Sequence, residues 1–405
     1  MIKIFLCHLI LTRDGFVEKA FLAVKDDVVL GLFTEIGDLP AFDAFYELEG
    51  VVIPSLVNSH THLELAASSY NNLSDKELWN WILDTIKYKR SLSSEDFRNN
   101  LSQNEKLFYE KGVAIAGDVR SVLPKECHFD LLRGVIFFEL LGYYEELFRQ
   151  KFEEFMVFLE STNNYNNFKA GVSIHSLYTT PFSKAKEVVK FARKKALPIM
   201  IHLAETEQED VLFFSDDTSG FRKIFPNADF ENHNFKSYAD IIDFLDLGGD
   251  SFIVHCVNLT EKDWKKVKER GINVVFCPKS NLFWNDKLPD FSYAIDLNVN
   301  FMLGTDSFRT NSCSDLLEDA KLMYKNTRVK DAALQILYAI TYKGRDLLKT
   351  KGVGIESGDV CSFVFLPVKC SKENAAEAVL TQNVKPIVYQ KDFKNEVFGF
   401  FEKQF

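Results

Sequence analysis

Five of the eight histidines in this chain stand in short segments that could bind a metal ion. Each segment ends or follows a short apolar run. Imidazole and carboxylate groups are the ligands of catalytic zinc sites, which leave one coordination position for water. These are the parts that metal-assisted hydrolysis requires. In chain order the segments are His60-Thr61-His62, His175, His202-Leu203-Ala204-Glu205, His255 and Gly304-Thr305-Asp306.

Two of these histidines are separated by a single residue. On a β-strand, residues two apart point to the same face, so His60 and His62 can bind one ion together. We predict His202 and Asp306 as the third and fourth protein ligands. His255 should lie beside the ion.

Glu205 and His255 are acid–base groups that a purely structural zinc site does not need. Glu205 follows His202 by three residues, far enough along to face a substrate instead of the metal. Their presence favours an enzyme over the alternative of a non-catalytic metal-binding protein.

The apolar runs that carry these segments alternate with helical patterns after residue 50, which is typical of βα units in a parallel sheet. The pattern predicts the α/β class and a (β/α)8 TIM barrel, in which active-site residues gather at the C-terminal ends of the strands. All five segments lie at such ends. The predicted strands are 51–58, 113–118, 134–140, 170–174, 197–203, 251–255, 272–276 and 300–303. The predicted helices include 75–89, 143–160, 183–195, 260–270 and 314–324.

Both ends of the chain are rich in short strands. We expect residues 1–50 and 351–405 to form one small β-sandwich domain, and residues 51–350 to form the barrel domain. The strands predicted there are 2–11, 18–25, 27–34, 358–368 and 385–389. The stretch 206–250 is longer than a usual βα connection and is predicted to hold an active-site lid.

Composition limits the partners. The net charge is −10 and no basic stripe follows any helical pattern, which argues against a nucleic acid. No run approaches the ~20 apolar residues that span a membrane. The seven cysteines are scattered without a Cys-x-x-Cys pair, which is typical of a reducing compartment. We expect a cytoplasmic protein that acts on a small molecule. Whether it forms a homo-oligomer is left open.

Five motifs make the chain similar to the amidohydrolase superfamily, and within it to the aminohydrolases of purines and related heterocycles. The resemblance covers nearly the whole chain. The chain departs from the usual pattern of this family at two places. Ser55 stands where the family has glycine, and Ser176-Leu177 stand where it has Ala-Pro. The motifs are Pro54-Ser55-Leu56-Val57-Asn58-Ser59-His60-Thr61-His62, His202-Leu203-Ala204-Glu205-Thr206, Val254-His255-Cys256, Cys277-Pro278-Lys279-Ser280-Asn281-Leu282 and Leu303-Gly304-Thr305-Asp306-Ser307.

The resemblance implies one divalent metal ion, zinc or sometimes iron, on the ligands His60, His62, His202 and Asp306. Many two-metal relatives use a carboxylated lysine in strand four. Here that strand has no lysine beyond Lys169 at its start, so we predict a single metal.

The resemblance also implies how the reaction proceeds. The metal lowers the pKa of a bound water from ~15.7 towards ~7. Glu205 would protonate the ring nitrogen, while His255 and Asp306 would take the proton of the water. His175 would contact the substrate.

Within this branch, two segments are most similar to the deaminases of 6-amino-6-deoxyfutalosine, which belong to menaquinone biosynthesis. The segments are Ser59-His60-Thr61-His62-Leu63-Glu64-Leu65 and Val135-Ile136-Phe137-Phe138-Glu139-Leu140-Leu141-Gly142. That substrate joins an adenine nucleoside to a benzoate. Arg120 and Arg309 are candidates for binding its carboxylate through two hydrogen bonds.

Other substrates stay open at this point. The same machinery could deaminate S-adenosylhomocysteine, methylthioadenosine, adenosine or guanine. It could also cleave a cyclic amide or remove a halide, although Glu205 favours a substrate with a ring nitrogen.

Overall fold

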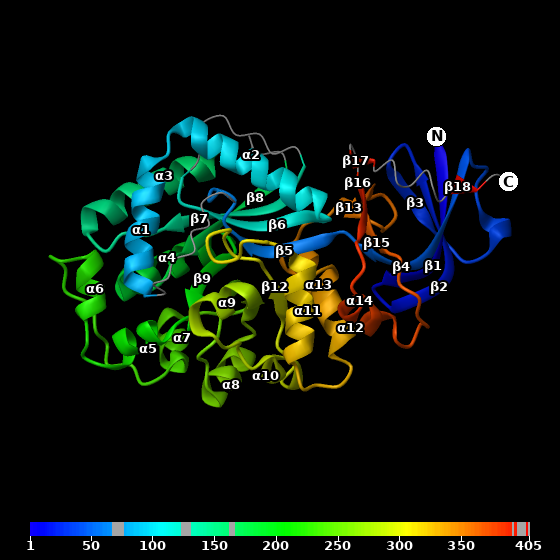
Figure 1. The fold of residues 1–405 in the computed structure, drawn as a ribbon. Helices are drawn as coiled ribbons and strands as arrows, with labels where there is room; N and C mark the ends of the chain where they lie inside the picture. The colour runs from blue at the N-terminus through cyan, green and yellow to red at the C-terminus, as the bar shows by residue number, and fades with distance from the viewer. Residues whose placement is uncertain (67–76, 123–130, 162–166, 391–392, 395–401, 404–405) are drawn as a thin grey trace.

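The structure is a computed structural model that describes residues 1–66, 77–122, 131–161, 167–390, 393–394 and 402–403. It consists of an eight-stranded parallel barrel flanked by helices and of a separate sheet built from both ends of the chain (Figure 1). The predicted α/β class and TIM barrel are therefore confirmed.

The barrel strands follow one another in chain order, and each pairs in parallel with the next. Their residues are buried almost throughout, which explains why they read as continuous apolar runs without alternation. The strands are β5 (Leu56–Thr61), β6 (Val113–Arg120), β7 (Arg133–Leu140), β8 (Phe168–Ile174), β9 (Ile199–Leu203), β10 (Ser251–His255), β11 (Asn273–Phe276) and β12 (Phe301–Leu303).

The barrel closes between its first and last strands through backbone atoms at the C-terminal end. The amides of Thr305 and Asp306 both donate to the carbonyl of His60, each at 3.1 Å. An isolated parallel bridge joins Thr61 to Asp306. We call the two hydrogen bonds to the carbonyl of His60 the closing contact.

One predicted strand is divided in the structure. Residues 51–58 are split at Ser55, because β4 (Ala44–Pro54) belongs to the terminal sheet and only β5 belongs to the barrel. Residues 51–57 are buried on both sides of the break. Hydrophobicity therefore stays continuous where the chain passes from one sheet to the other, and the pattern does not reveal the turn.

Helices lie in the connections between the strands, apart from the one between β6 and β7, where the described residues form no helix (Figure 1). The predicted helices occur with shifts of a few residues at their ends. The start of predicted helix 75–89 lies partly outside the described residues. The helices are α1 (Leu78–Ser91), α2 (Ser94–Glu110), α3 (Glu145–Ser161), α4 (Phe182–Lys194), α5 (Glu207–Phe214), α6 (Ser219–Ile224), α7 (Tyr238–Leu245), α8 (Glu261–Arg270), α9 (Pro278–Asn285), α10 (Phe291–Asp296), α11 (Leu316–Asn326), α12 (Ala332–Ala339), α13 (Tyr342–Leu347) and α14 (Ala375–Thr381).

The stretch 206–250, predicted to hold a lid, contains α5, α6 and α7 between β9 and β10. A lid function for it stays a prediction.

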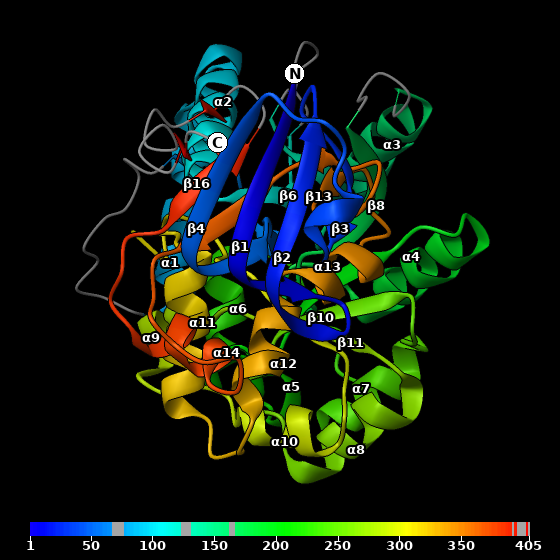
Figure 2. The same cartoon turned by 90° about the vertical axis from the view of Figure 1, so that its right-hand side faces the viewer.

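The terminal sheet brings the two ends of the chain together, and both termini lie at that end of the molecule (Figures 1 and 2). It contains ten strands in the described part, with β4 pairing to β1 on one side and β15 on the other. Besides β4, its strands are β1 (Ile2–Thr12), β2 (Gly15–Lys25), β3 (Val28–Phe33), β13 (Val353–Gly354), β14 (Val360–Cys361), β15 (Phe363–Leu366), β16 (Ile387–Gln390), β17 (Phe393–Lys394) and β18 (Glu402–Lys403).

Residues of the terminal sheet belong to several hydrophobic clusters, two of which show how the sheet packs. One cluster, with Phe5, Leu22 and Phe363, is enclosed by strands of the sheet alone. The other is the main core of the barrel, and it includes Leu9, Leu11 and Phe16 from β1 and β2. The sheet is thus packed onto the barrel as well as around its own core.

Among the residues that the structure places, we find no helix with the length and apolar character needed to cross a membrane.

Candidate active site

The four predicted metal ligands come together at the C-terminal end of the barrel. All four side chains are buried, and one ligand atom from each lies within 4.8 Å of the others. Asp306 Oδ1 lies 3.4 Å from His60 Nε2 and 3.5 Å from His62 Nε2. His202 Nε2 lies 3.2 Å from His60 Nε2. Three imidazoles and one carboxylate thus surround a common point.

The charge state of this group fits a divalent cation. Burial lowers the pKa of His202 to about 4, with the neighbouring His60 adding to the effect. Burial also holds the pKa of His62 well below its usual value. Burial alone would raise the pKa of Asp306. The hydrogen bond from His60 and the nearby imidazoles instead bring the pKa of Asp306 well below its usual range. Neutral imidazoles beside an ionised carboxylate are the forms that bind a metal.

Further contacts hold these ligands in orientation. His202 Nδ1 lies 2.6 Å from the carbonyl of His175, which leaves Nε2 directed to the cluster. The hydroxyls of Ser280 and Thr310 donate to Asp306 Oδ2 at 2.6 and 2.8 Å, which leaves Oδ1 for the other ligands. Such outer contacts fix the tautomer and the orientation of metal ligands.

Glu205 and His255 lie together beside the cluster. Glu205 Oε1 is 3.3 Å from His255 Nε2, and both groups approach Asp306. Burial, followed by the charges of Asp306 and Glu209, raises the pKa of Glu205 well above its usual value. A carboxyl group with a raised pKa can stay protonated near neutral pH and act as a proton donor. His255 Nδ1 lies 3.1 Å from the amide of Asn281.

The backbone takes an unusual conformation where the strands reach the site. Ala204, His255 and Asp306 have φ values of 58°, 78° and 57°. For residues other than glycine these values cost energy and are found where the fold must direct a side chain. The amide of Glu205 donates to Glu209 Oε2 at 2.7 Å, which fixes the turn into α5.

The ligand cluster opens into a cavity that is lined by predicted site residues and by further residues that were not predicted. Predicted residues that line it include His175 and Glu205. One wall is a stripe of α1 with a spacing of three or four residues, a signal that was visible in the sequence once the helix was placed. The stripe consists of Leu78, Trp81, Thr85 and Lys89, and the other lining residues not predicted are Leu65, Glu139, Tyr178, Trp284 and Ser307.

The two predicted carboxylate-binding arginines are not among the lining residues. Arg120 is fully buried and pairs with Asp118. Arg309 is buried too, pairs with Asp84 and lies over the rings of Trp81 and Tyr88. Their predicted role as substrate ligands therefore stays a prediction, and Lys89 is the basic residue that the cavity lining itself contains.

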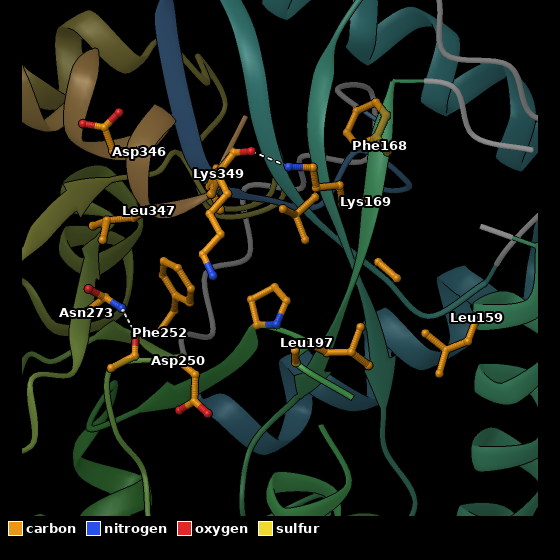
Figure 3. A pocket seen from close by; sticks show the side chains of 16 residues that line it. Leu159, Phe168, Lys169, Leu197, Asp250, Phe252, Asn273, Asp346, Leu347 and Lys349 are labelled. Carbon is orange, nitrogen blue, oxygen red and sulfur yellow. Dashed lines mark hydrogen bonds between the residues drawn. The ribbon is translucent and has the colours of Figure 1, made fainter. Parts of the chain in front are cut away.

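A larger hollow of about 870 Å³ lies at the N-terminal ends of β8 to β11, at the opposite end of the strands (Figure 3). Its two carboxylates are already paired, Asp250 with Arg193 and Asp346 with Arg13. Lys169 donates to the carbonyl of Lys349 there, far from the ligand cluster. No histidine or cysteine is among its described lining residues, whereas His202, Glu205 and His255 line the smaller cavity.

Comparisons with known proteins agree with this geometry. Residues 51–392 match the sequence profile described as the amidohydrolase family. A 5-methylthioadenosine/S-adenosylhomocysteine deaminase of Natronomonas pharaonis is 26% identical over 361 residues, which cover 85% of this chain and 79% of that protein. An aminodeoxyfutalosine deaminase of Nitratiruptor sp. is 22% identical over 324 residues, or 78% and 77% of the two chains.

The fold is similar to that of a solved structure, the Helicobacter pylori aminofutalosine deaminase in complex with methylthio-coformycin. The TM-score is 0.77 over 95% of this chain and 97% of that chain. Since the sequence identity is 18%, this likeness concerns the fold.

Proposed function

This chain belongs to the amidohydrolase family, as a hydrolase of C–N bonds, and we propose that it deaminates an adenine nucleoside with one divalent metal ion. The observation that carries this proposal is the position of Glu205 and His255, 3.3 Å apart, beside the buried ligand cluster. A site for metal binding alone would need neither group.

We propose that His60, His62, His202 and Asp306 hold the ion, which we expect to be zinc, with iron as the alternative. Mixed nitrogen and oxygen ligands suit both metals. A divalent ion bound there would supply Lewis acidity and make a water molecule nucleophilic near neutral pH.

The protein groups then account for the protons. In the proposed reaction, water adds to the amine-bearing carbon of the purine, and Glu205 gives a proton to the adjacent ring nitrogen. His255 and Asp306 accept the proton of the water. They then pass this proton to the amine, so that the C–N bond breaks and ammonia leaves, and the added hydroxyl gives its proton to Glu205 as the carbonyl forms. Acid–base help of this kind typically contributes ~10²–10⁴-fold.

We propose 6-amino-6-deoxyfutalosine as the first substrate to test, converted to futalosine and ammonia in menaquinone biosynthesis. Support comes from the sequence motifs around His60 and Glu139 and from the relative of that name in Nitratiruptor sp.. Methylthioadenosine and S-adenosylhomocysteine are the second choice, because the relative from Natronomonas pharaonis carries those names. All three have an adenine, a ribose and a modified 5′ position.

The test is ammonia release from a panel of these nucleosides, together with adenosine and guanine, by purified protein whose metal content has been measured. We expect turnover of a 5′-modified adenine nucleoside, its loss on chelation, and its return when zinc is added. If chelation leaves turnover intact, or if no adenine nucleoside is deaminated, the proposed function is wrong.

A further inference from the structure

We propose that Glu139, at the end of β7, binds the ribose hydroxyls of the substrate together with Thr85 of α1. This assignment rests on the proposed function, because it concerns how a nucleoside lies in the same cavity. Both residues line that cavity, and they are 1% and 9% exposed.

Three polar atoms of this wall have no hydrogen-bond partner among the described residues. Glu139 Oε1, Thr85 Oγ1 and Trp81 Nε1 are buried and make no hydrogen bond within the part of the chain that the structure describes. A buried carboxylate oxygen without a partner costs free energy, commonly ~1–3 kcal/mol or more for a charged group. Buried groups of this kind beside a catalytic cavity are explained when a ligand supplies their partners.

The charges on this wall determine which ligand fits. Lys89 Nζ lies 2.5 Å from Glu64 Oε1 and 3.6 Å from Glu139 Oε2, and it also donates to Ser121 at 3.0 Å. One cation therefore faces two carboxylates. A further anion from a substrate would have to compete with Glu64 and Glu139 for Lys89, so the wall favours a neutral group that donates hydrogen bonds.

A vicinal diol meets these requirements. It offers two hydroxyl donors to a carboxylate, and its oxygens can accept from the Thr85 hydroxyl and the Trp81 indole N–H. The ligand cluster and Glu205 occupy another part of the same cavity wall. A nucleoside whose base faces the cluster would bring its ribose towards α1 and β7.

The test measures binding and turnover separately. 5′-Deoxyinosine and its 2′-deoxy and 3′-deoxy counterparts lack the amine, so calorimetry on the zinc-loaded protein can measure their affinities without turnover. A hydrogen bond to a charged group contributes ~1.5–3 kcal/mol, and each 1.4 kcal/mol is tenfold. We expect the wild type to bind 5′-deoxyinosine roughly ten- to a hundredfold more tightly than at least one of its 2′-deoxy and 3′-deoxy counterparts. Glu139→Gln should reduce this preference by about tenfold.

Glu105→Gln is the matched control, because Glu105 is a buried glutamate on α2 that accepts from the amides of Leu131 and Leu132 and does not line the cavity. Its preference for the ribonucleoside should equal that of the wild type. Thr85→Val gives a second measurement should Glu139→Gln fail to fold, and it should also weaken the preference.

Equal affinity of the wild type for all three nucleosides would overturn the assignment, and so would an unchanged preference in both cavity variants. Failure of the proposed function looks different. In that case the wild type would show the hydroxyl preference without deaminating any adenine nucleoside.

Discussion

Among single residues, Glu205 has the most direct part in the proposed reaction, because its buried carboxyl group is the proton donor to the ring. Its raised pKa keeps the proton available, and its position next to His255 places it beside the ligand cluster. Glu205 is not one of the four predicted metal ligands, His60, His62, His202 and Asp306. Loss of its acidity should therefore affect catalysis and leave metal binding intact.

We expect Glu205→Gln to lower kcat by ~10²–10⁴-fold, the usual contribution of a positioned general acid. Its zinc content by elemental analysis should match that of the wild type. Glu207→Gln is the control, since Glu207 is exposed, pairs with Lys287 and lies two residues further on. Unchanged kcat in Glu205→Gln would show that the proton comes from another group.

Asp319 allows a test of how burial affects a single carboxyl group. Burial raises the pKa of Asp319 to about 7 from an ordinary 3.8, although Lys279 and Asn311 donate to it. The folded chain therefore keeps this proton to a higher pH than the unfolded chain does. The contribution to stability is complete below about pH 4 and is lost as the pH rises to about 7.

Relative to Asp319→Asn, the free energy of unfolding of the wild type should fall by up to ~1.4 kcal/mol per pH unit across that window. Urea unfolding at several pH values measures the slope. Glu318→Gln, at the exposed neighbouring position, should keep the slope of the wild type. Parallel curves for the wild type and Asp319→Asn would mean that Asp319 ionises normally.

The predictability of the site also differs from residue to residue. His60, His62, His202 and Asp306 could be placed because each ends an apolar run, and the ends of parallel strands meet at one edge of a barrel. The pairing of Arg309 with Asp84 joins positions 225 residues apart and follows no local pattern. Long-range ion pairs of this sort decide where an arginine points, and the sequence alone does not show them.

Among the structural elements, β5 and β12 deserve comparison because the closing contact joins them next to the ligands. Gly304 precedes this contact, and a Cβ there would lie 2.6 Å from the carbonyl oxygen of His60 and 2.8 Å from its Cβ. These distances are too short for any side chain, so the last strand approaches the first only because residue 304 is glycine.

Gly304→Ala should thus destabilise the protein by about 1–3 kcal/mol, as overpacked positions do, and weaken zinc binding. Thermal unfolding and metal titration measure the two effects. Gly249→Ala is the control, because its added Cβ would meet only the carbonyl of Gly271 at 3.6 Å. Wild-type zinc affinity in Gly304→Ala would show that the closing contact does not position His60.

The elements of the barrel were predictable because strands and helical patterns alternate along the chain and the eight buried strands leave strong apolar runs. The division at Ser55 was not, since residues 51–57 are buried on both sides of it and no polar stretch marks the change of sheet. The cavity wall of α1 was missed for a different reason. A helix can be read from its pattern, but which face meets the active site depends on how it packs.

For the molecule as a whole, the terminal sheet and the barrel share one core. We propose residues 1–50 with 351–405, and residues 51–350, as its two domains, with β4 carrying the terminal sheet on to Pro54. Leu9, Leu11 and Phe16 of the first belong to the hydrophobic cluster of the second. Burial of such side chains stabilises by ~1.5–3 kcal/mol each, and domains are stable by only about 5–15 kcal/mol.

Residues 51–350 expressed alone should consequently fail to form a stable barrel. We expect aggregation or rapid proteolysis, with recovery of a folded, zinc-binding protein when the terminal segments are restored. Circular dichroism and limited proteolysis of the fragment measure the result. A cooperative unfolding transition in the isolated fragment would show that the barrel does not need the sheet.

The closing contact is made by the carbonyl of one residue and the amides of two others, whereas the imidazole and carboxylate groups nearby are side chains. Every amino acid except proline offers the same main-chain N–H and C=O groups. Replacing a coordinating group during evolution would therefore leave the ring of strands joined, and new reactivity could arise at this rim without rebuilding the scaffold. Residue 304, by contrast, has no such freedom.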